Sequence, residues 1–244
     1  MERKNAWTTY DEATLKALEN TAAAYRNYLD NGKTERECVN EAVKMAEAAG
    51  YVPLETILKT KRRLGAGDKI YANCMGKALA LFQLGEEPLE NGMNILGAHI
   101  DSPRVDVKQN PLYENEGQAY LDTHYYGGIK KYQWVTVPLA IHGVVCRKDG
   151  TVVTVTIGED DNDPVFMVSD LLIHLSADQM KKTLAEGIVA EQLNVILGTE
   201  PIEGEGSDMV KLNVMKLLNE KYGLIETDFL SAELTIVPAG RCRE

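Results

Sequence analysis

The sequence of 244 residues is poor in the features that mark membrane, secreted and disulfide-linked proteins. No apolar run approaches the ~18 residues of a membrane-spanning helix. The residues Met1–Asn5 lead into a charged pattern without the apolar core of a signal peptide. The cysteines are far apart and form no CxxC pair: Cys38, Cys74, Cys146 and Cys242. Because structural zinc clusters and thioredoxin-like sites need close pairs, we expect isolated thiols in a reducing compartment, with the cytoplasm as the default location.

Positive charge is also scarce. Lys and Arg total 26 against 37 Asp and Glu, which gives a net charge of -11. That field would repel nucleic acid and an anionic membrane surface, so neither is expected as a partner. The GxSxG motif of serine hydrolases and the GxxxxGK[ST] phosphate loop are absent. With 44% hydrophobic residues, the chain can still form a sizeable core.

The first fifty residues follow a helical pattern. Apolar side chains recur every three or four residues and share one helix face: Leu15, Leu18, Ala22, Tyr25 and Leu29. Asn31-Gly32 predicts the end of this helix. Thr34 and Glu37 form a capping box that predicts a second helix, ending at Gly50.

The next segment, from residue 64 to 101, reads as short strands. Lys69–Asn73 and Ala78–Phe82 predict a hairpin across Met75-Gly76. Asn94–Asp101 is short and mostly apolar, which predicts a strand buried on both faces of a sheet. Its carboxyl end is the place where ligands collect in open α/β sheets.

Beyond Arg104 the composition becomes β-rich. Two strand patterns flank a Lys148-Asp149-Gly150 turn: Tyr132–Val145 and Thr151–Ile157. Helical patterns follow at Asp178–Ala185 and Ser207–Tyr222, and a last strand pattern at Ala232–Val237. We expect this last strand to rejoin the first sheet, so that the β-rich block is a domain inserted into another domain.

His99 and Asp101 form a His-x-Asp motif at the end of the predicted buried strand. Imidazole is a good zinc ligand, and a carboxylate two residues later can hold its ring by a hydrogen bond. Alternatively, the pair caps a turn before Pro103, and a three-residue motif also occurs by chance. A zinc site needs several more ligands, and the neighbouring sequence supplies none.

The other three histidines favour structural interpretations. His174 is flanked by aliphatic residues, a pattern more typical of a half-buried ring than of an active-site group. His124 precedes a Gly-Gly loop and His142 lies within a strand pattern. The acidic run Glu159-Asp160-Asp161 is interpreted as a solvated turn, because its spacing does not match a calcium loop.

Four ordered motifs together resemble the aspartyl aminopeptidase family, metallopeptidase family eighteen, which includes yeast vacuolar aminopeptidase one. The motifs are Gly97–Pro103, Thr123–Trp134 running on to Pro138-Leu139, Leu172–Leu175 and Glu233–Gly240. The second is similar to the bacterial branch. The resemblance extends over essentially all 244 residues.

The resemblance implies an α/β fold: an incomplete zinc-peptidase mixed β-sheet domain with flanking helices, interrupted by an inserted β-rich dimerisation domain. Residues 1–103 would form the first part of the catalytic domain. Residues 104–230 would form the inserted domain, and residues 231–244 the return strand of the catalytic domain. Family members build homo-oligomers, from dimers to dodecamers.

The resemblance also implies roles for three residues. His99 would bind one of two zinc ions, and Asp101 would orient its ring. His174 resembles the histidine that the inserted domain offers to a neighbouring subunit's active site. The reaction would remove the N-terminal residue of a peptide by attack of zinc-bound water. Cobalt or manganese could replace zinc with such ligands.

The remaining family ligands and the catalytic glutamate follow the Val-Pro-Ala-Gly strand, where this chain stops at Glu244. We therefore expect an N-terminal portion that is inactive alone. The alternative function is a non-catalytic oligomerisation or regulatory module that pairs with full-length subunits. A ligand-binding α/β domain without metal is a third interpretation.

Overall fold

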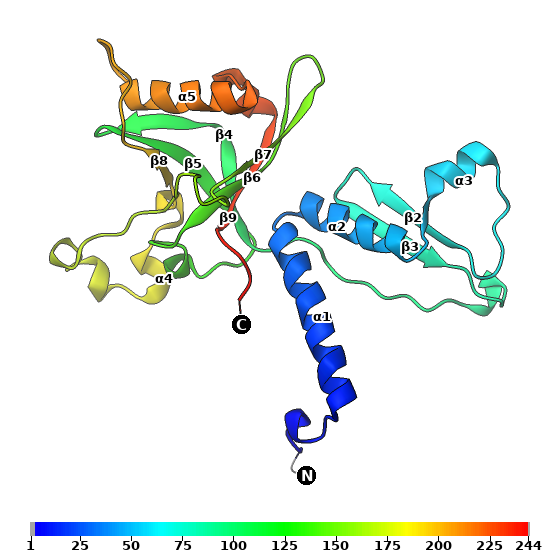
Figure 1. Ribbon diagram of the computed structural model, residues 1–244. Helices are drawn as coiled ribbons and strands as arrows, with labels where there is room; N and C mark the ends of the chain where they lie inside the picture. The colour runs from blue at the N-terminus through cyan, green and yellow to red at the C-terminus, as the bar shows by residue number, and fades with distance from the viewer. Residues whose placement is uncertain (1–2, 244) are drawn as a thin grey trace. The chain divides into compact units, whose positions relative to one another are not determined.

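The computed structural model describes residues 3–243 and divides the chain into two compact units (Figure 1). The first unit comprises Met1–Asp101 with Arg241–Glu244, and the second comprises Ser102–Gly240. Both units combine a β-sheet with helices, so the predicted α/β class is confirmed. Among residues 3–243, no helix is both long and apolar enough to cross a membrane.

Side-chain caps set the starts of two long helices in the first unit. α1 (Glu12–Asn31) begins after Asp11, whose carboxylate accepts a main-chain N–H hydrogen bond of 2.8 Å. α2 (Glu35–Ala48) begins with the predicted capping box. The Thr34 hydroxyl accepts from the Glu37 N–H at 3.3 Å, and the Glu37 carboxylate accepts from the Thr34 N–H at 3.0 Å.

The sheet of the first unit has three strands in the order β1-β2-β3. Its strands and the other short elements of this unit are β1 (Val52–Pro53), β2 (Lys69–Cys74), β3 (Ala78–Gln83), α3 (Leu54–Thr60), η1 (Ala6–Thr8) and η2 (Leu89–Asn91). β1 runs parallel to β2, and β2 antiparallel to β3. The predicted hairpin is confirmed, with Met75 and Gly76 at φ 56° and 71° in the left-handed region of its turn.

The predicted buried strand at Asn94–Asp101 is wrong for this structure. These residues adopt no strand, and Ile95 and Leu96 are 80% and 101% exposed. A strand needs a neighbour that accepts and donates its main-chain hydrogen bonds. Within residues 3–243 no strand pairs with this segment. An apolar run indicates that a segment can be buried, but it does not indicate whether another strand is available to pair with it.

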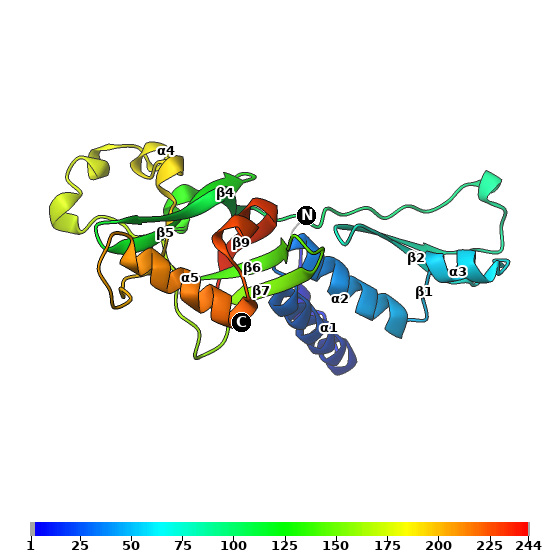
Figure 2. The ribbon, with the colours of Figure 1, turned by 90° about the horizontal axis from the view of Figure 1, so that it is seen from above.

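The second unit contains a six-stranded antiparallel sheet in the order β7-β6-β9-β4-β5-β8. The strands are β4 (Arg104–Asn115), β5 (Gln118–Tyr126), β6 (Leu139–Cys146), β7 (Val152–Ile157), β8 (Val195–Gly198) and β9 (Ala232–Pro238). The helical elements are η3 (Lys131–Gln133), η4 (Ile173–Leu175), η5 (Gln179–Lys181), α4 (Leu184–Gly187), η6 (Ala190–Gln192), α5 (Met209–Tyr222) and η7 (Glu226–Ser231). α5 packs on β4, β5 and β8 (Figure 1 and Figure 2).

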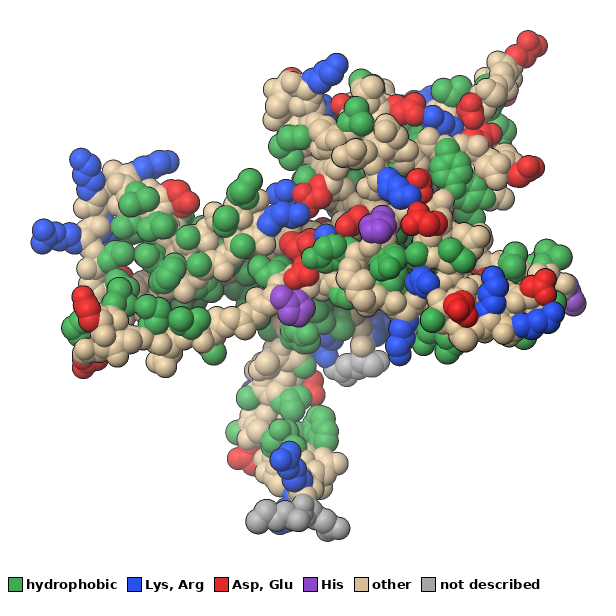
Figure 3. Space-filling model, turned by 180° about the vertical axis from the view of Figure 1, so that it is seen from behind, with side chains coloured by type: hydrophobic (Ala, Val, Ile, Leu, Met, Phe, Trp, Pro, Cys, Tyr) green, Lys and Arg blue, Asp and Glu red, His purple; other side chains and the backbone are tan. Residues whose placement is uncertain are grey.

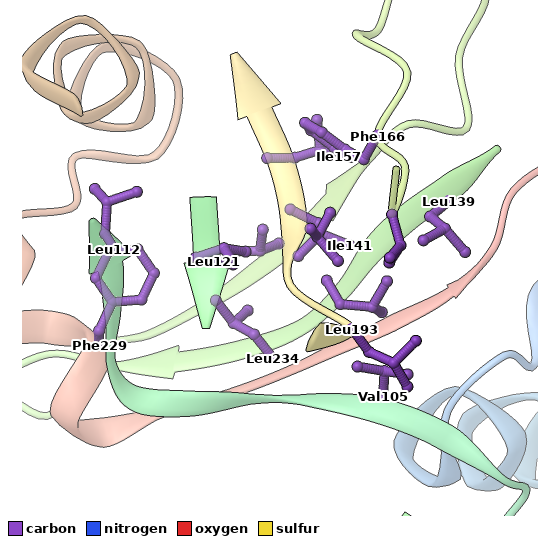
Figure 4. Packing of buried hydrophobic residues seen from close by; sticks show 14 of the residues in the cluster. Val105, Leu112, Leu121, Leu139, Ile141, Ile157, Phe166, Leu193, Phe229 and Leu234 are labelled. Atoms are coloured by element: carbon purple, nitrogen blue, oxygen red, sulfur yellow. The ribbon is translucent and has the colours of Figure 1, made fainter. Parts of the chain in front are cut away.

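The hydrophobic core of the second unit lies on the face of the sheet that α5 covers. Figure 4 shows buried side chains from several strands meeting there. The largest of the fully buried ones are Leu121, Leu139, Leu193 and Ile236. Since successive residues of a strand point to opposite faces, the side chains between these positions form the other face of the sheet.

The last strand differs from its expected place. β9 pairs with β6 on one side and β4 on the other, in the second unit, and not with the first sheet. The second unit accordingly continues to Gly240 rather than ending before residue 231. The run Leu234–Val237 is buried on both faces, as in any central strand. Such a pattern identifies a central strand without identifying its sheet.

The helical prediction for the end of the chain is confirmed at α5 and is wrong in part for residues 178–185. α5 ends at Gly223, whose φ of 65° is the usual left-handed stop. The Arg147 side chain donates a hydrogen bond to the carbonyl of Tyr222 in the last turn. Residues 178–185 form only the short elements η5 and the start of α4.

Candidate functional site

His99 lies in the extended segment that ends the first part of the first unit. Its Nδ1 is 2.8 Å from the main-chain oxygen of Asp101 and 3.5 Å from the Asp101 carboxylate. The His99 side chain is 83% exposed, and no other residue within 3–243 is found hydrogen-bonded to its ring. The structure therefore brings His99 and Asp101 together, with the ring open to solvent on its other side.

This contact defines what the ring can bind. If Nδ1 carries the proton, it donates to the Asp101 carbonyl and leaves the lone pair of Nε2 free to coordinate a metal. A hydrogen bond at the second ring nitrogen is the usual companion of a metal-bound histidine. The shorter contact is made by the main-chain oxygen of Asp101, whereas the sequence pointed to its carboxylate.

The residues present fit part of a zinc site. Zinc sites in proteins use at least three protein ligands, commonly imidazole, thiolate or carboxylate. Nowhere in residues 3–243 do three or more His, Cys, Asp or Glu side chains come together in a way that could hold a metal ion. The described part of the chain thus offers one imidazole, and a complete site needs further ligands.

His174 belongs to the second unit, in η4. Its aliphatic neighbours Leu172, Ile173 and Leu175 are 70%, 64% and 70% exposed, and His174 is exposed as well. The interpretation of this histidine as a half-buried ring is therefore wrong, because the flanking side chains point into solvent themselves. Figure 3 shows hydrophobic side chains on the surface of the second unit, interspersed with acidic and basic ones.

His142 has a structural role, as its place in a strand pattern suggested. It is 4% exposed, and its Nε2 is 2.9 Å from a carboxylate oxygen of Glu159. The other oxygen of Glu159 accepts a 3.1 Å hydrogen bond from the Gly240 N–H. Glu159 is thus not simply part of a solvated turn, since it joins β6 to the end of β9.

A row of polar residues crosses the second sheet on the face opposite to the hydrophobic core. Register pairs His142 with Thr235, Thr235 with Asp106, and Asp106 with His124. Asp106 accepts a 2.7 Å hydrogen bond from the side chain of Arg104. Sequence reasoning missed this row because its members are far apart in the chain and meet only through strand register.

Comparison with known proteins shows which family this chain resembles. The family model described as "Aminopeptidase I zinc metalloprotease (M18)" matches residues 28–243. A probable M18 family aminopeptidase 1 of Clostridium acetobutylicum is 57% identical over 244 residues, which are 100% of this chain and 52% of that protein. The chain therefore spans about half the length of this curated relative.

Solved structures of aminopeptidases match the fold of this chain. The crystal structure of aminopeptidase I from Clostridium acetobutylicum matches with a TM-score of 0.88 at 55% identity, over 100% of this chain and 54% of that one. A more distant structure, the mApe1 dodecamer of S. cerevisiae, shares the fold with a TM-score of 0.62 at 17% identity, over 91% of this chain and 49% of that one. With a family model that matches nearly the whole chain and close relatives in the same family, this chain belongs to the M18 family of zinc metallopeptidases.

Proposed function

We propose that this chain forms the N-terminal part of a metal-dependent aminopeptidase, with His99 as one ligand to zinc. The observation that carries the proposal is the geometry of His99. Its Nδ1 is held 2.8 Å from a main-chain oxygen, which leaves Nε2 for the metal. The 57% identity to a probable M18 aminopeptidase extends over the whole chain and supports the same assignment.

The zinc site would be shared with ligands from outside residues 3–243. Two zinc ions per site is the number that the family resemblance implies, and cobalt or manganese would also suit imidazole and carboxylate ligands. Bound zinc supplies a Lewis acid that activates water for peptide hydrolysis. Because the described residues hold no three-ligand group, we propose that this chain alone is inactive.

Asp101 is the positioning residue for His99 in this proposal. Its main-chain oxygen fixes the tautomer, and its carboxylate, 3.5 Å from Nδ1, helps to hold the orientation of the ring. The variant Asp101→Ala keeps the oxygen and removes the carboxylate. A small loss of zinc affinity would assign the positioning to the main chain, and a loss of about 10- to 100-fold would assign it to the carboxylate.

His174 would act at a subunit interface. It lies among exposed aliphatic side chains, which is the composition of a surface that packs against another protein. We propose a homo-oligomer in which this segment contacts a second subunit and His174 approaches that subunit's substrate. The second unit, which extends to Gly240, would then serve dimerisation. Peptides would be the substrate, and the cytoplasm would be the location. No observation favours the non-catalytic module.

A chimera tests the proposed function. This chain replaces the matching half of the Clostridium acetobutylicum relative, and the product is assayed for zinc content and for release of N-terminal residues from short peptides. We expect His99→Ala to lower the turnover of the chimera by more than about 100-fold and to lower its zinc content.

The control for this experiment is His124→Ala. His124 is also exposed, but it lies on β5 opposite Asp106 and outside the proposed site. Full zinc content and full activity in the His99→Ala chimera would contradict the ligand assignment. An equal loss in the His124→Ala chimera would show that the effect is not specific to His99.

A further inference from the structure

The second unit contains a cavity of about 510 Å³ between its sheet and α5. Leu121, Ile141, Val155, Ile157 and Leu234 form its floor on four strands, and all five are buried. Figure 4 shows Leu121, Ile141 and Leu234 on the same side of the sheet, with Ile141 and Leu234 on the neighbouring strands β6 and β9 and Leu121 on β5, beyond β4. The floor is therefore part of the rigid sheet, so that the cavity is preformed rather than a gap between loops.

The opposite wall is equally apolar. α5 contributes Val214, Leu217 and Leu218, and β8 contributes Leu197. A cavity of this size is in the range of ~300–1,000 Å³ that binds small molecules, and it is too small for a lipid with two long chains. The lining is mainly branched aliphatic side chains. Such a surface favours a ligand whose body is a single apolar chain.

The polar side chains of the lining come from two segments, the loop at residues 162–163 and the last turn of α5 at residues 220–222, and the ion pair between Asp163 and Lys221 joins these segments at what we take as the mouth. Lys221, from the last turn of α5, is 3.0 Å from the carboxylate of Asp163 on the facing loop. Asp163 also accepts a hydrogen bond of 2.8 Å from the Gly158 N–H, so its oxygens are well occupied. The Lys221 ammonium uses one of its three protons on Asp163 and also lies 5.5 Å from the centre of the Tyr222 ring. Its side chain is 51% exposed, so a ligand can replace water on the remaining protons.

The charge of the mouth is balanced before any ligand binds. Asp163 pairs with Lys221, and Glu220 lies 3.9 Å from Lys216 on the same helix. An incoming acceptor group can therefore use the remaining Lys221 protons without first breaking the pair with Asp163. A cationic head group would instead have to displace Lys221.

We propose that this cavity binds a medium-chain aliphatic carboxylate, with its chain against the apolar floor and its head group on the Lys221 ammonium. A ligand with one polar end suits a cavity in which the polar groups are confined to one end. The inference is independent of peptidase activity, since every residue that carries it belongs to the second unit and none belongs to the His99 site.

Calorimetric titration of the 244-residue chain with decanoate and with decanol tests the proposal. We expect both to bind saturably, and decanoate to bind about fivefold more tightly because of a partly exposed charge contact with Lys221. Lys221→Met should remove the preference for decanoate and leave decanol binding unchanged. Lys211→Met is the matched control and should keep the preference, since Lys211 also lies on α5 and neither Lys211 nor its partner Glu226 lines the cavity.

A second variant tests the location. Val214→Phe fills the cavity from α5 and should abolish binding of both probes, with folding checked by circular dichroism. Leu197→Phe fills it from β8 and takes its place if Val214→Phe does not fold. Absence of saturable decanoate binding below about 1 mM would overturn the proposal. So would equal binding of the two probes by the wild-type chain, or undiminished binding by a folded, filled variant.

Discussion

Glu114 on β4 accepts a 2.9 Å hydrogen bond from the main-chain N–H of Val210 at the start of α5. The same carboxylate oxygen accepts a second 2.9 Å bond from Lys211. Asp208, which precedes the helix, has a φ of 60° and its side chain makes no capping hydrogen bond. A residue almost a hundred positions earlier thus takes the place of a local N-cap and fixes α5 to the sheet.

Replacing this carboxylate should weaken the second unit. We expect Glu114→Ala to lower the free energy of unfolding by about 1–2 kcal/mol, because two N–H groups at the helix start lose a charged acceptor. Urea unfolding followed by circular dichroism measures the change. Glu205→Ala, in the exposed loop before α5, should change stability by less than about 0.5 kcal/mol. Equal effects would contradict the capping role.

The buried contact between His142 and Glu159 should also contribute to stability. We expect His142→Ala to cost about 1.5–3 kcal/mol, since it removes a buried hydrogen bond to a carboxylate. The exposed His124 provides the comparison, and His124→Ala should stay within about 0.5 kcal/mol of the wild type. Thermal or urea unfolding measures the stability of the two variants. Equal stability of His142→Ala and His124→Ala would contradict the structural role of His142.

Gly143 is required where β6 meets β9. A Cβ atom at this position would lie 1.9 Å from the carbonyl oxygen of Glu233, and the φ of Gly143 is 150°. We expect Gly143→Ala to destabilise the chain by about 3 kcal/mol or more, because two central strands would have to separate. At Gly128 no described atom lies within 4 Å of the corresponding position, so Gly128→Ala should be nearly neutral. Comparable unfolding midpoints would contradict this prediction.

Asp163 should make stability depend on acid pH. Burial raises the pKa of its carboxyl, but hydrogen bonds from Gly158 and Lys221 outweigh burial and lower the pKa below the ordinary 3.8. As the pH falls, the Asp163 carboxyl is therefore protonated in the unfolded chain before it is protonated in the folded chain. The stabilisation is therefore present above about pH 4 and is lost as the pH falls through the lower, folded pKa.

The variant Asp163→Asn isolates that contribution. The difference in unfolding free energy between wild type and variant should be constant above about pH 5 and shrink below about pH 4. Asp161→Asn, an exposed neighbour, should show no such dependence. A difference that stays constant down to about pH 2 would show that the Asp163 contacts do not favour its ionised form.

The exposed segment around His174 gives a prediction for assembly. We expect the double variant Leu172→Asp, Ile173→Asp to reduce self-association in sedimentation velocity, because charges would enter the proposed subunit contact. Leu58→Asp, on α3, is the control with a similar exposure of 67%. Identical sedimentation of the two variants would place the contact elsewhere.

Local signals in the sequence predicted much of the fold. The Thr34–Glu37 capping box, the hairpin at Met75-Gly76 and the helical pattern that ends at Tyr222 each depend on residues close together in the chain. Such features can be predicted from a short stretch of sequence, because the residues that form a cap or a turn are only a few positions apart.

What the sequence could not predict depends on partners far along the chain. The Asn94–Asp101 run has the composition of a strand, but a strand also needs a neighbour. Glu159 looked like part of a solvated turn until its contacts with His142 and Gly240 were known. For the candidate site, the motif pointed to His99 and Asp101, whereas the main-chain contact between them is visible only in three dimensions.

The place of β9 has a consequence for how the protein is made. During synthesis, β4 with β5 and β6 with β7 emerge first and can each pair as a hairpin. β9 lies between these two hairpins, so the sheet cannot close until residues 232–238 have left the ribosome. Until then the inner edges of both hairpins remain open to other chains. Such late, long-range pairing slows folding, so we expect the nascent second unit to depend on chaperones more than the hairpin of the first.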